Sequence, residues 1–176
     1  MSFFYEFDEV DTFTTGTVGR PGSRTFYLFV RAGTERLAVK CEKVQTAAVA
    51  QYLEKVLVDL PPPEDRPLPG AMDVDPTRFD EVFVLGPIGL GYDRSSDRVL
   101  LQLEEMVPGD LEDDAEDGDD DTDDEVDRGH VRLYITRGQA AAFASWANDV
   151  VQSGRPECRW CSGPIDPDGH ACPRMN

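Results

Sequence analysis

Residues 25–31, TFYLFVR, are followed by the turn Ala32-Gly33-Thr34-Glu35 and by residues 36–41, RLAVKC. Both runs are rich in β-branched and aromatic residues, which favour strands, and the glycine between them is typical of a turn. From Val44 to Leu60 the apolar residues instead recur at helical spacing. Pro61-Pro62-Pro63 ends this helix, because proline cannot continue the backbone hydrogen bonding. The stretch predicts two strands followed by one helix.

Further strands are predicted before this stretch. Tyr5 and Phe7 alternate with acidic residues, and 13–17 is rich in β-branched residues. The glycines and proline of 16–24 are typical of a hairpin turn. Residues 1–61 are therefore interpreted as a β-β-β-α unit.

The second half repeats this order. Strands are predicted over 81–85, 98–103 and 130–135, and a helix over 139–151. The segment 86–97, GPIGLGYDRSSD, is interpreted as turn material. Thr136 and Gln139 have the spacing of a capping box, in which each side chain satisfies a free backbone N–H of the other residue. Residues 79–153 are thus interpreted as a second β-β-β-α unit.

The two halves can also be aligned with one another. FTTGTVG (13–19) aligns with FVLGPIG (83–89), and QTAAVA (45–50) aligns with QAAAFA (139–144). We expect an α+β fold in which two β-β-β-α halves, related by a pseudo-twofold duplication, share a sheet or small barrel. Few positions are identical, so chance similarity between two ordinary α+β halves remains an alternative. A Pro-rich linker is expected over 62–78 and a separate C-terminal segment over 154–176.

The charge of the chain is concentrated in one segment. The formal net charge is -18, and 13 carboxylates without any Lys or Arg lie in 110–127. This segment has almost no apolar residues to bury, so a disordered acidic insert is expected over 107–128. The acidity disfavours direct nucleic-acid binding, which depends on Lys and Arg. It suits either a solvated loop or a protein partner with a basic surface.

Four potential metal ligands lie close together near the C-terminus. Cys158-Arg-Trp-Cys161 is followed by His170-Ala-Cys172, with Pro and Gly in the loop between the two pairs. Zinc prefers four such ligands in a tetrahedron, and a Cys₃His set leaves no coordination position open. We expect Cys158, Cys161, His170 and Cys172 to hold one structural zinc ion in a zinc knuckle. A redox Cys-x-x-Cys is disfavoured, because that motif normally opens a helix after a strand, whereas Gly and Pro flank this pair.

Other sequence features give weaker indications. Gly16–Gly22 and Gly86–Gly91 do not match a phosphate-binding loop and are interpreted as hairpin turns that need positive φ. Cys41 is expected to be buried, and His130 has no evident catalytic partner. The N-terminus lacks the pattern of a signal peptide, and no apolar run is long enough to span a bilayer. With cysteines clustered for metal binding, these features favour the cytoplasm.

Two segments resemble a known family. YEFDEVDTFTTGTVGRPGSRTFYLFVR (5–31) and GRPECRWCSGPIDPDGHACPRMN (154–176) are similar to an uncharacterised actinobacterial domain of unknown function, often encoded near the mycothiol-pathway cysteine ligase. The resemblance covers most of the chain except 62–78 and the acidic insert. The family's motif Cys-x-x-Cys…Gly-His-x-Cys-Pro-Arg maps onto 158–174, with Ser162 where glycine is expected. The resemblance supports the zinc ligands and a bacterial cytoplasm but implies no reaction.

These observations favour a non-catalytic, zinc-containing interaction or adaptor protein. Arg159, Trp160 and Arg174 of the knuckle would form its contact surface. One alternative is an enzyme or enzyme subunit with a ligand pocket between the halves, although the sequence makes no positive case for catalysis. A second alternative is a transcription- or nucleic-acid-associated factor, which would need a basic face. Such a face would come from Arg20, Arg24, Arg31 and Arg36.

Overall fold

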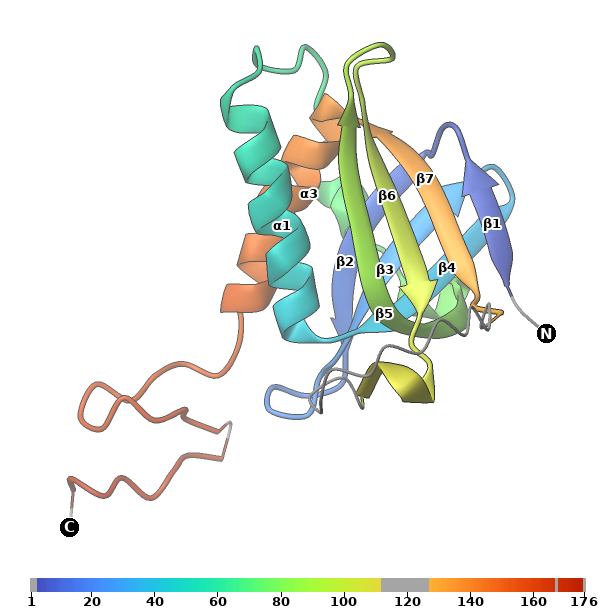
Figure 1. Cartoon of the computed structure of the whole chain (residues 1–176). Coiled ribbons are helices and arrows are strands. Elements are labelled where there is room, and N and C mark those ends of the chain that lie inside the picture. Colours follow the sequence, from blue (N-terminus) through green and yellow to red (C-terminus); the bar gives the residue numbers. More distant parts are fainter. Residues whose placement is uncertain (1–2, 112–126, 167, 176) are drawn as a thin grey trace, which may run out of the picture.

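A computed structural model describes residues 3–111, 127–166 and 168–175 (Figure 1). The strands are β1 (Phe4–Phe7), β2 (Thr12–Val18), β3 (Thr25–Ala32), β4 (Glu35–Cys41), β5 (Asp80–Asp93), β6 (Arg98–Glu105) and β7 (His130–Thr136). The helices are α1 (Lys43–Val58), α2 (Pro69–Met72) and α3 (Arg137–Gln152), with 3₁₀ turns η1 (Pro76–Arg78) and η2 (Pro108–Leu111). The predicted strands and the two long helices are all present, but four strands, β1 to β4, precede α1 where a β-β-β-α unit is expected.

The seven strands form one curved, mixed sheet in the order β1-β7-β6-β5-β4-β3-β2 (Figure 1). Each half contributes an antiparallel meander, β2-β3-β4 or β5-β6-β7. The meanders join where β4 runs parallel to β5. At the other end of the order, β1 runs parallel to β7. The structure therefore has an α+β fold, and the two halves share one sheet.

Strand β5 is much longer than predicted, because Gly86–Gly91 belongs to the strand and not to a hairpin turn. Its first residues pair with β4, and its later residues pair with β6 after a register shift between Leu85 and Ile88. Gly86 lies at this shift, where a Cβ would be only 2.8 Å from the Met106 Cα. Glycine is thus needed for close approach of the chains and not for positive φ. In the β2–β3 hairpin the expectation is correct for Gly19 and Gly22, which have φ 107° and 92°, whereas Gly16 lies within β2.

Both long helices begin with a capping box that also anchors them to the sheet. In α3, Thr136 and Gln139 cap one another as predicted, and in α1 the equivalent pair is Glu42 and Gln45. The Gln45 amide also donates to the Leu85 carbonyl over 3.1 Å. The Gln139 amide donates to the Val10 carbonyl over 2.7 Å. Each glutamine therefore links the first turn of its helix to a strand or strand junction of the other half.

The two helices pack together on one side of the sheet, as Figure 1 shows. The rings of Phe13 in β2 and Phe143 in α3 are stacked with centroids 4.5 Å apart. The Trp146 indole N–H donates to the Thr15 carbonyl over 2.8 Å. The fully buried core comes from both halves, with Leu28, Val30 and Leu53 from the first and Leu101, Leu133 and Phe143 from the second.

The Pro-rich segment 62–78 is packed against the outer face of the β2–β3–β4 meander. Thr14, which is fully buried, donates its hydroxyl to the Met72 carbonyl over 2.7 Å. Phe29 contacts Phe79 with ring centroids 4.9 Å apart. This segment therefore covers residues of the meander that point away from the main core.

The predicted acidic insert falls mostly on residues 112–126, which lie outside the described residues. At its two described ends, Arg128 forms a bidentate pair with Asp110 at 2.7 Å. This pair lowers the pKa of the Asp110 carboxyl below its ordinary value. In the part of the chain that the structure describes, no helix has the length and apolar character needed to cross a membrane.

Candidate metal centre

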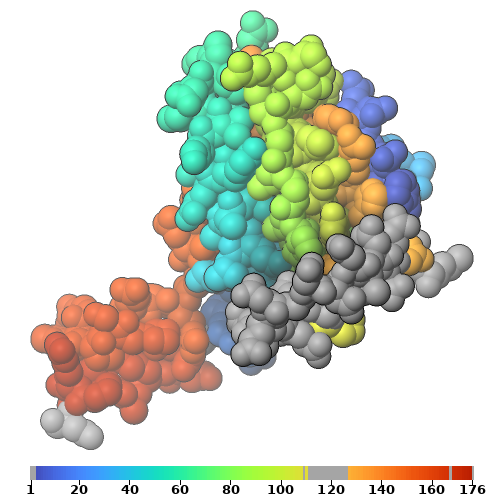
Figure 2. All heavy atoms as spheres, in the orientation of Figure 1, coloured from blue at the N-terminus to red at the C-terminus, as the bar shows by residue number. Residues whose placement is uncertain are grey.

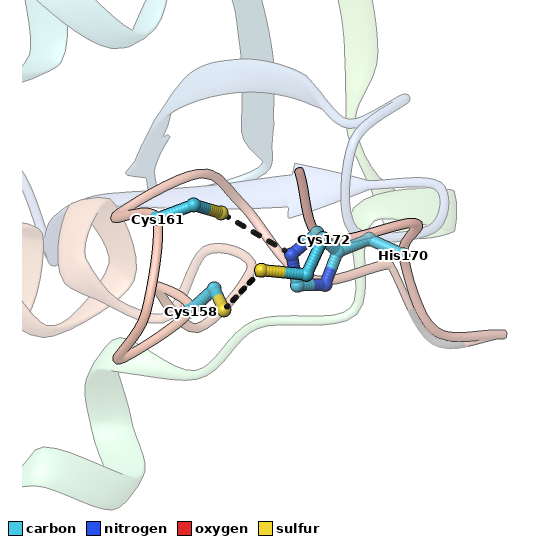
Figure 3. Close-up of side chains that lie close together, drawn as sticks. All are labelled: Cys158, Cys161, His170 and Cys172. Carbon is cyan, nitrogen blue, oxygen red and sulfur yellow. Dashed lines mark hydrogen bonds between the residues drawn. The ribbon is translucent and has the colours of Figure 1, made fainter. Parts of the chain in front are cut away.

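The structure brings together the four residues that the sequence predicts as metal ligands (Figure 3). One sulfur or nitrogen atom from each of Cys158, Cys161, His170 and Cys172 lies within 4.8 Å of the others. The Cys158 and Cys172 sulfurs are 3.9 Å apart, and the Cys161 sulfur is 3.4 Å from His170 Nε2. The cluster can hold one metal ion.

These separations fit a tetrahedral ion. With Zn–S bonds of about 2.3 Å, two sulfurs of a tetrahedron lie about 3.8 Å apart, and a sulfur–nitrogen pair is slightly closer. The observed values match both expectations. The sulfur–sulfur distance of 3.9 Å also excludes a Cys158–Cys172 disulfide in this geometry, because that bond is about 2.0 Å long.

A tight backbone turn positions the first pair of ligands. The Ser162 N–H donates to the Cys158 carbonyl over 2.7 Å, and the Cys158 N–H donates to the Gly163 carbonyl over 2.7 Å. Ser162 has φ 59°, in the left-handed region that favours glycine. The resemblance expects glycine here, and the backbone conformation gives the physical reason.

The same turn favours the thiolate of Cys158. Backbone N–H groups of Trp160 and then Cys161 donate to its sulfur and lower the pKa of the thiol to about 7. Thiolates are the form in which cysteine binds metals. At Cys172 the strongest single influence, the Arg174 N–H, also lowers the pKa. Burial and hydrogen bonds with Cys161 and Cys158 outweigh it, so the pKa of Cys172 is raised.

The segment that carries the cluster projects from the end of α3 as a small lobe (Figure 2). The Arg24 guanidinium donates to the Ser153 hydroxyl over 3.1 Å where this lobe begins. Within the lobe, Arg155 pairs with Asp166 at 2.6 Å. The Trp160 side chain is 52% exposed, and the Arg159 guanidinium lies 5.2 Å from the centre of its ring. The lobe therefore presents an aromatic–cationic pair to solvent.

The other residues considered in the sequence lie apart from the cluster. Cys41 is buried as expected and contacts the Thr46 hydroxyl, and burial raises the pKa of its thiol to about 11. His130 lies in β7, and its ring centroid is 4.1 Å from that of Phe4. Arg24 and Arg31 flank opposite ends of β3, about 24 Å apart at the strand rise per residue. The basic face considered for nucleic-acid binding is therefore divided between two ends of the sheet.

Several hollows lie away from the cluster, and two of them contain charged side chains that bear on function. One, of about 600 Å³, lies between the halves and is lined by Asp8, Glu9, Asp93, Ser96, Arg98 and Tyr134. Glu9 pairs with Arg98 at 3.0 Å, and Asp93 accepts hydrogen bonds from Ser95 and Ser96, which lower its pKa to about 2. The charged groups here are thus largely satisfied by their neighbours.

The second hollow, of about 350 Å³, is lined by Arg31, Arg36 and Arg78 among others. Sequence reasoning missed this group, because the three arginines meet only through strand pairing and the path of the 62–78 segment. The sequence did contain a signal for part of this group. Arg31 and Arg36 lie at equal distances on either side of a predicted hairpin turn, and this spacing places them opposite one another on the two strands.

Comparison with known proteins yields one match. A family model described as "Protein of unknown function (DUF3090)" matches residues 5–172, nearly the whole chain and all four cluster residues. Searches of the curated proteins and of the solved structures give no match.

Proposed function

The chain belongs to the DUF3090 family of proteins of unknown function, and from that premise we propose that it is a non-catalytic adaptor whose C-terminal knuckle holds one structural zinc ion. In this proposal the zinc fixes the knuckle, and the knuckle contacts a partner protein. An actinobacterial origin and a cytoplasmic location, where thiols stay reduced, are part of the same proposal.

Zinc is the metal that best suits the cluster. Three thiolates and one imidazole are soft to borderline ligands, which favour zinc over the hard cations magnesium and calcium. Four protein ligands within 4.8 Å fill a tetrahedron, so no position remains for water or substrate. A structural role therefore fits better than a catalytic role.

The observation that carries the adaptor role is the exposure of Trp160 on the knuckle. A tryptophan that is 52% exposed, with Arg159 stacked on it, is an unusual surface feature in a lobe of about twenty residues. Tryptophan and arginine are the residues most enriched at the energetic centres of protein interfaces. Met175, also on this lobe, adds a second exposed apolar side chain.

The partner we propose has a basic surface. The chain carries a net charge of -18, most of it from the 13 carboxylates of 110–127. Such a field accelerates the encounter with a cationic protein and repels nucleic acid. The acidic insert would then increase the rate of association, and the contact made by Trp160 would stabilise the complex.

Affinity capture from native lysate with matched single variants tests this role. We expect a partner to be retained by the intact chain and by Val58→Ala, which removes an even more exposed apolar side chain from α1. The same partner should be lost with Trp160→Ala, although that variant keeps all four zinc ligands. Capture that is unaffected by Trp160→Ala and by removal of residues 155–176 would refute the adaptor role.

We also propose that the two halves arose by duplication. The last strand of each meander, β4 or β7, runs parallel to a strand of the other half. The capping glutamines Gln45 and Gln139 each donate to a backbone carbonyl of the other half, at Leu85 and at Val10. These correspondences support a shared ancestry that the few sequence identities suggest only weakly.

A further inference from the structure

We propose that the hollow between the β3–β4 hairpin and the 62–78 segment binds a small molecule through its oxyanion group, a phosphate or a carboxylate, held by Arg31, Arg36 and Arg78. This site lies at the opposite end of β3 from Arg24 and the knuckle. It is therefore independent of the proposed adaptor role.

The first argument is the pairing of two arginines across strands. Arg31 of β3 lies directly opposite Arg36 of β4. Their neighbours Val30 and Leu37 are buried in the core, so the two arginines point to the outer face of the sheet. Like charges in directly opposed positions of an antiparallel pair are destabilising. An anion between them would remove this repulsion.

The second argument is the lack of a close ion pair to these arginines. Across residues 3–111, 127–166 and 168–175, the ion pairs involve Arg98, Arg128, Arg132, Arg137 and Arg155. Arg31, Arg36 and Arg78 do not take part in these close pairs, although Arg78 attracts the Asp75 carboxylate at longer range. Within the described residues, these three arginines share the walls of one hollow and none of them has a close ion pair. Arginine donates through a planar fork that fits phosphate and carboxylate groups.

The third argument is the shape of the hollow and the rigidity of its walls. Its volume of about 350 Å³ suits a small molecule, and the Phe79 ring and Val74 supply apolar wall. Phe79 is fixed against Phe29, and the Thr14–Met72 hydrogen bond holds the covering segment in place. The site is therefore largely formed before any ligand binds.

The charge balance of the walls favours an anion of limited charge. Asp73 and Asp75 also line the hollow. The Asp75 carboxylate accepts from the Thr77 hydroxyl over 2.7 Å and from its N–H over 3.0 Å, which start the turn that carries Arg78. Three arginines against two aspartates leave one net positive charge. The large negative charge elsewhere is screened beyond about 8 Å at physiological salt, so the local arginines dominate.

Titration with two simple anions tests the site. Inorganic phosphate and, separately, acetate are added to the full chain at constant ionic strength, and binding is followed by calorimetry. We expect saturable binding of at least one anion to the wild type. The affinity should fall at least tenfold in Arg31→Gln and in Arg36→Gln. Arg94→Gln, which removes an exposed arginine from the β5–β6 turn, should bind like the wild type.

The two anions and the thermal stability of the free variants separate the possible outcomes. Preference for phosphate or for acetate identifies the oxyanion of the natural ligand. Without added anion, Arg36→Gln should unfold at the same temperature as the wild type or higher, because it relieves repulsion. The proposal is overturned if neither anion binds saturably, or if the double variant Arg31→Gln/Arg36→Gln binds as well as the wild type. A lower unfolding temperature of Arg36→Gln without anion would show that the arginines are structural instead.

Discussion

Ser162 is the residue at which the knuckle departs most from an unstrained backbone. Its φ of 59° is a left-handed conformation that costs an L-residue about 1–2 kcal/mol. Glycine avoids this steric cost but loses more backbone entropy on folding, which offsets part of the gain. Ser162 directly follows the ligand Cys161 in the turn that joins Cys158 to Gly163. Any strain here therefore opposes closure of the metal site.

Replacement of this residue should strengthen metal binding. We predict that Ser162→Gly raises zinc affinity a few-fold, equivalent to about 0.5–1 kcal/mol, because folding of the turn is coupled to binding. Ser162→Ala retains the Cβ and should give no such gain. Competition with a chromophoric chelator measures both. Equal affinities for the glycine and alanine variants would show that the turn is not strained in the bound state.

Individual site residues could be predicted from the sequence where they lie close together in the chain, as the metal ligands do. Cys158 and Cys161 lie three positions apart, and His170 and Cys172 two, so each pair was visible without a fold. Arg31 and Arg36 gain their significance only from the register of β3 and β4 and from the segment that brings Arg78 beside them. Such a site depends on tertiary structure, and residue types alone do not reveal it.

Among the elements, the 62–78 segment differs most from its prediction as a linker. Its composition is rich in proline, but it contains α2 and η1 and is held by side chains of the sheet. It also crosses the start of α3, where a Cβ on Gly138 would overlap the Asp65 carbonyl oxygen. Glycine at this position allows the segment to follow its path over the helix.

We predict that Gly138→Ala destabilises the protein by about 1–3 kcal/mol, because the overlap forces the backbone of the segment to move. Gly91→Ala is the matched control, since a Cβ at Gly91 would meet no atom within 4 Å. Chemical denaturation of the two variants and the wild type measures the difference. Equal stability of Gly138→Ala and Gly91→Ala would mean that the segment does not pack on α3 as described.

The strands and long helices were predictable because their signals are periodic and local. The capping box at Thr136 and Gln139, for example, was correctly identified from spacing alone. Strand β5 was predicted too short, because its glycines were interpreted as turn formers. Glycine has two uses, positive φ and close approach, and only the pairing of β5 with both β4 and β6 shows that the second applies at Gly86.

For the whole molecule, the sheet and the knuckle are expected to be energetically separate. The core is built mainly from residues of β2–β7, α1 and α3, whereas Cys158 is the only buried apolar residue among the described residues of the knuckle. So little buried surface cannot offset the entropy of ordering the segment, and metal binding must supply the stabilisation. Loss of the metal should therefore disorder the knuckle and leave the sheet folded.

The central claim is that Cys158, Cys161, His170 and Cys172 together hold one zinc ion. Its most direct test is the zinc content of the purified protein by elemental mass spectrometry, with Cys158→Ser/Cys161→Ser compared with Cys41→Ser. Cys41 is buried at the end of β4 and is not part of the cluster, so its variant controls for the loss of a thiol. We predict one zinc per chain for the wild type and for Cys41→Ser, and none for the double variant. A full equivalent of zinc in the double variant would contradict the assignment.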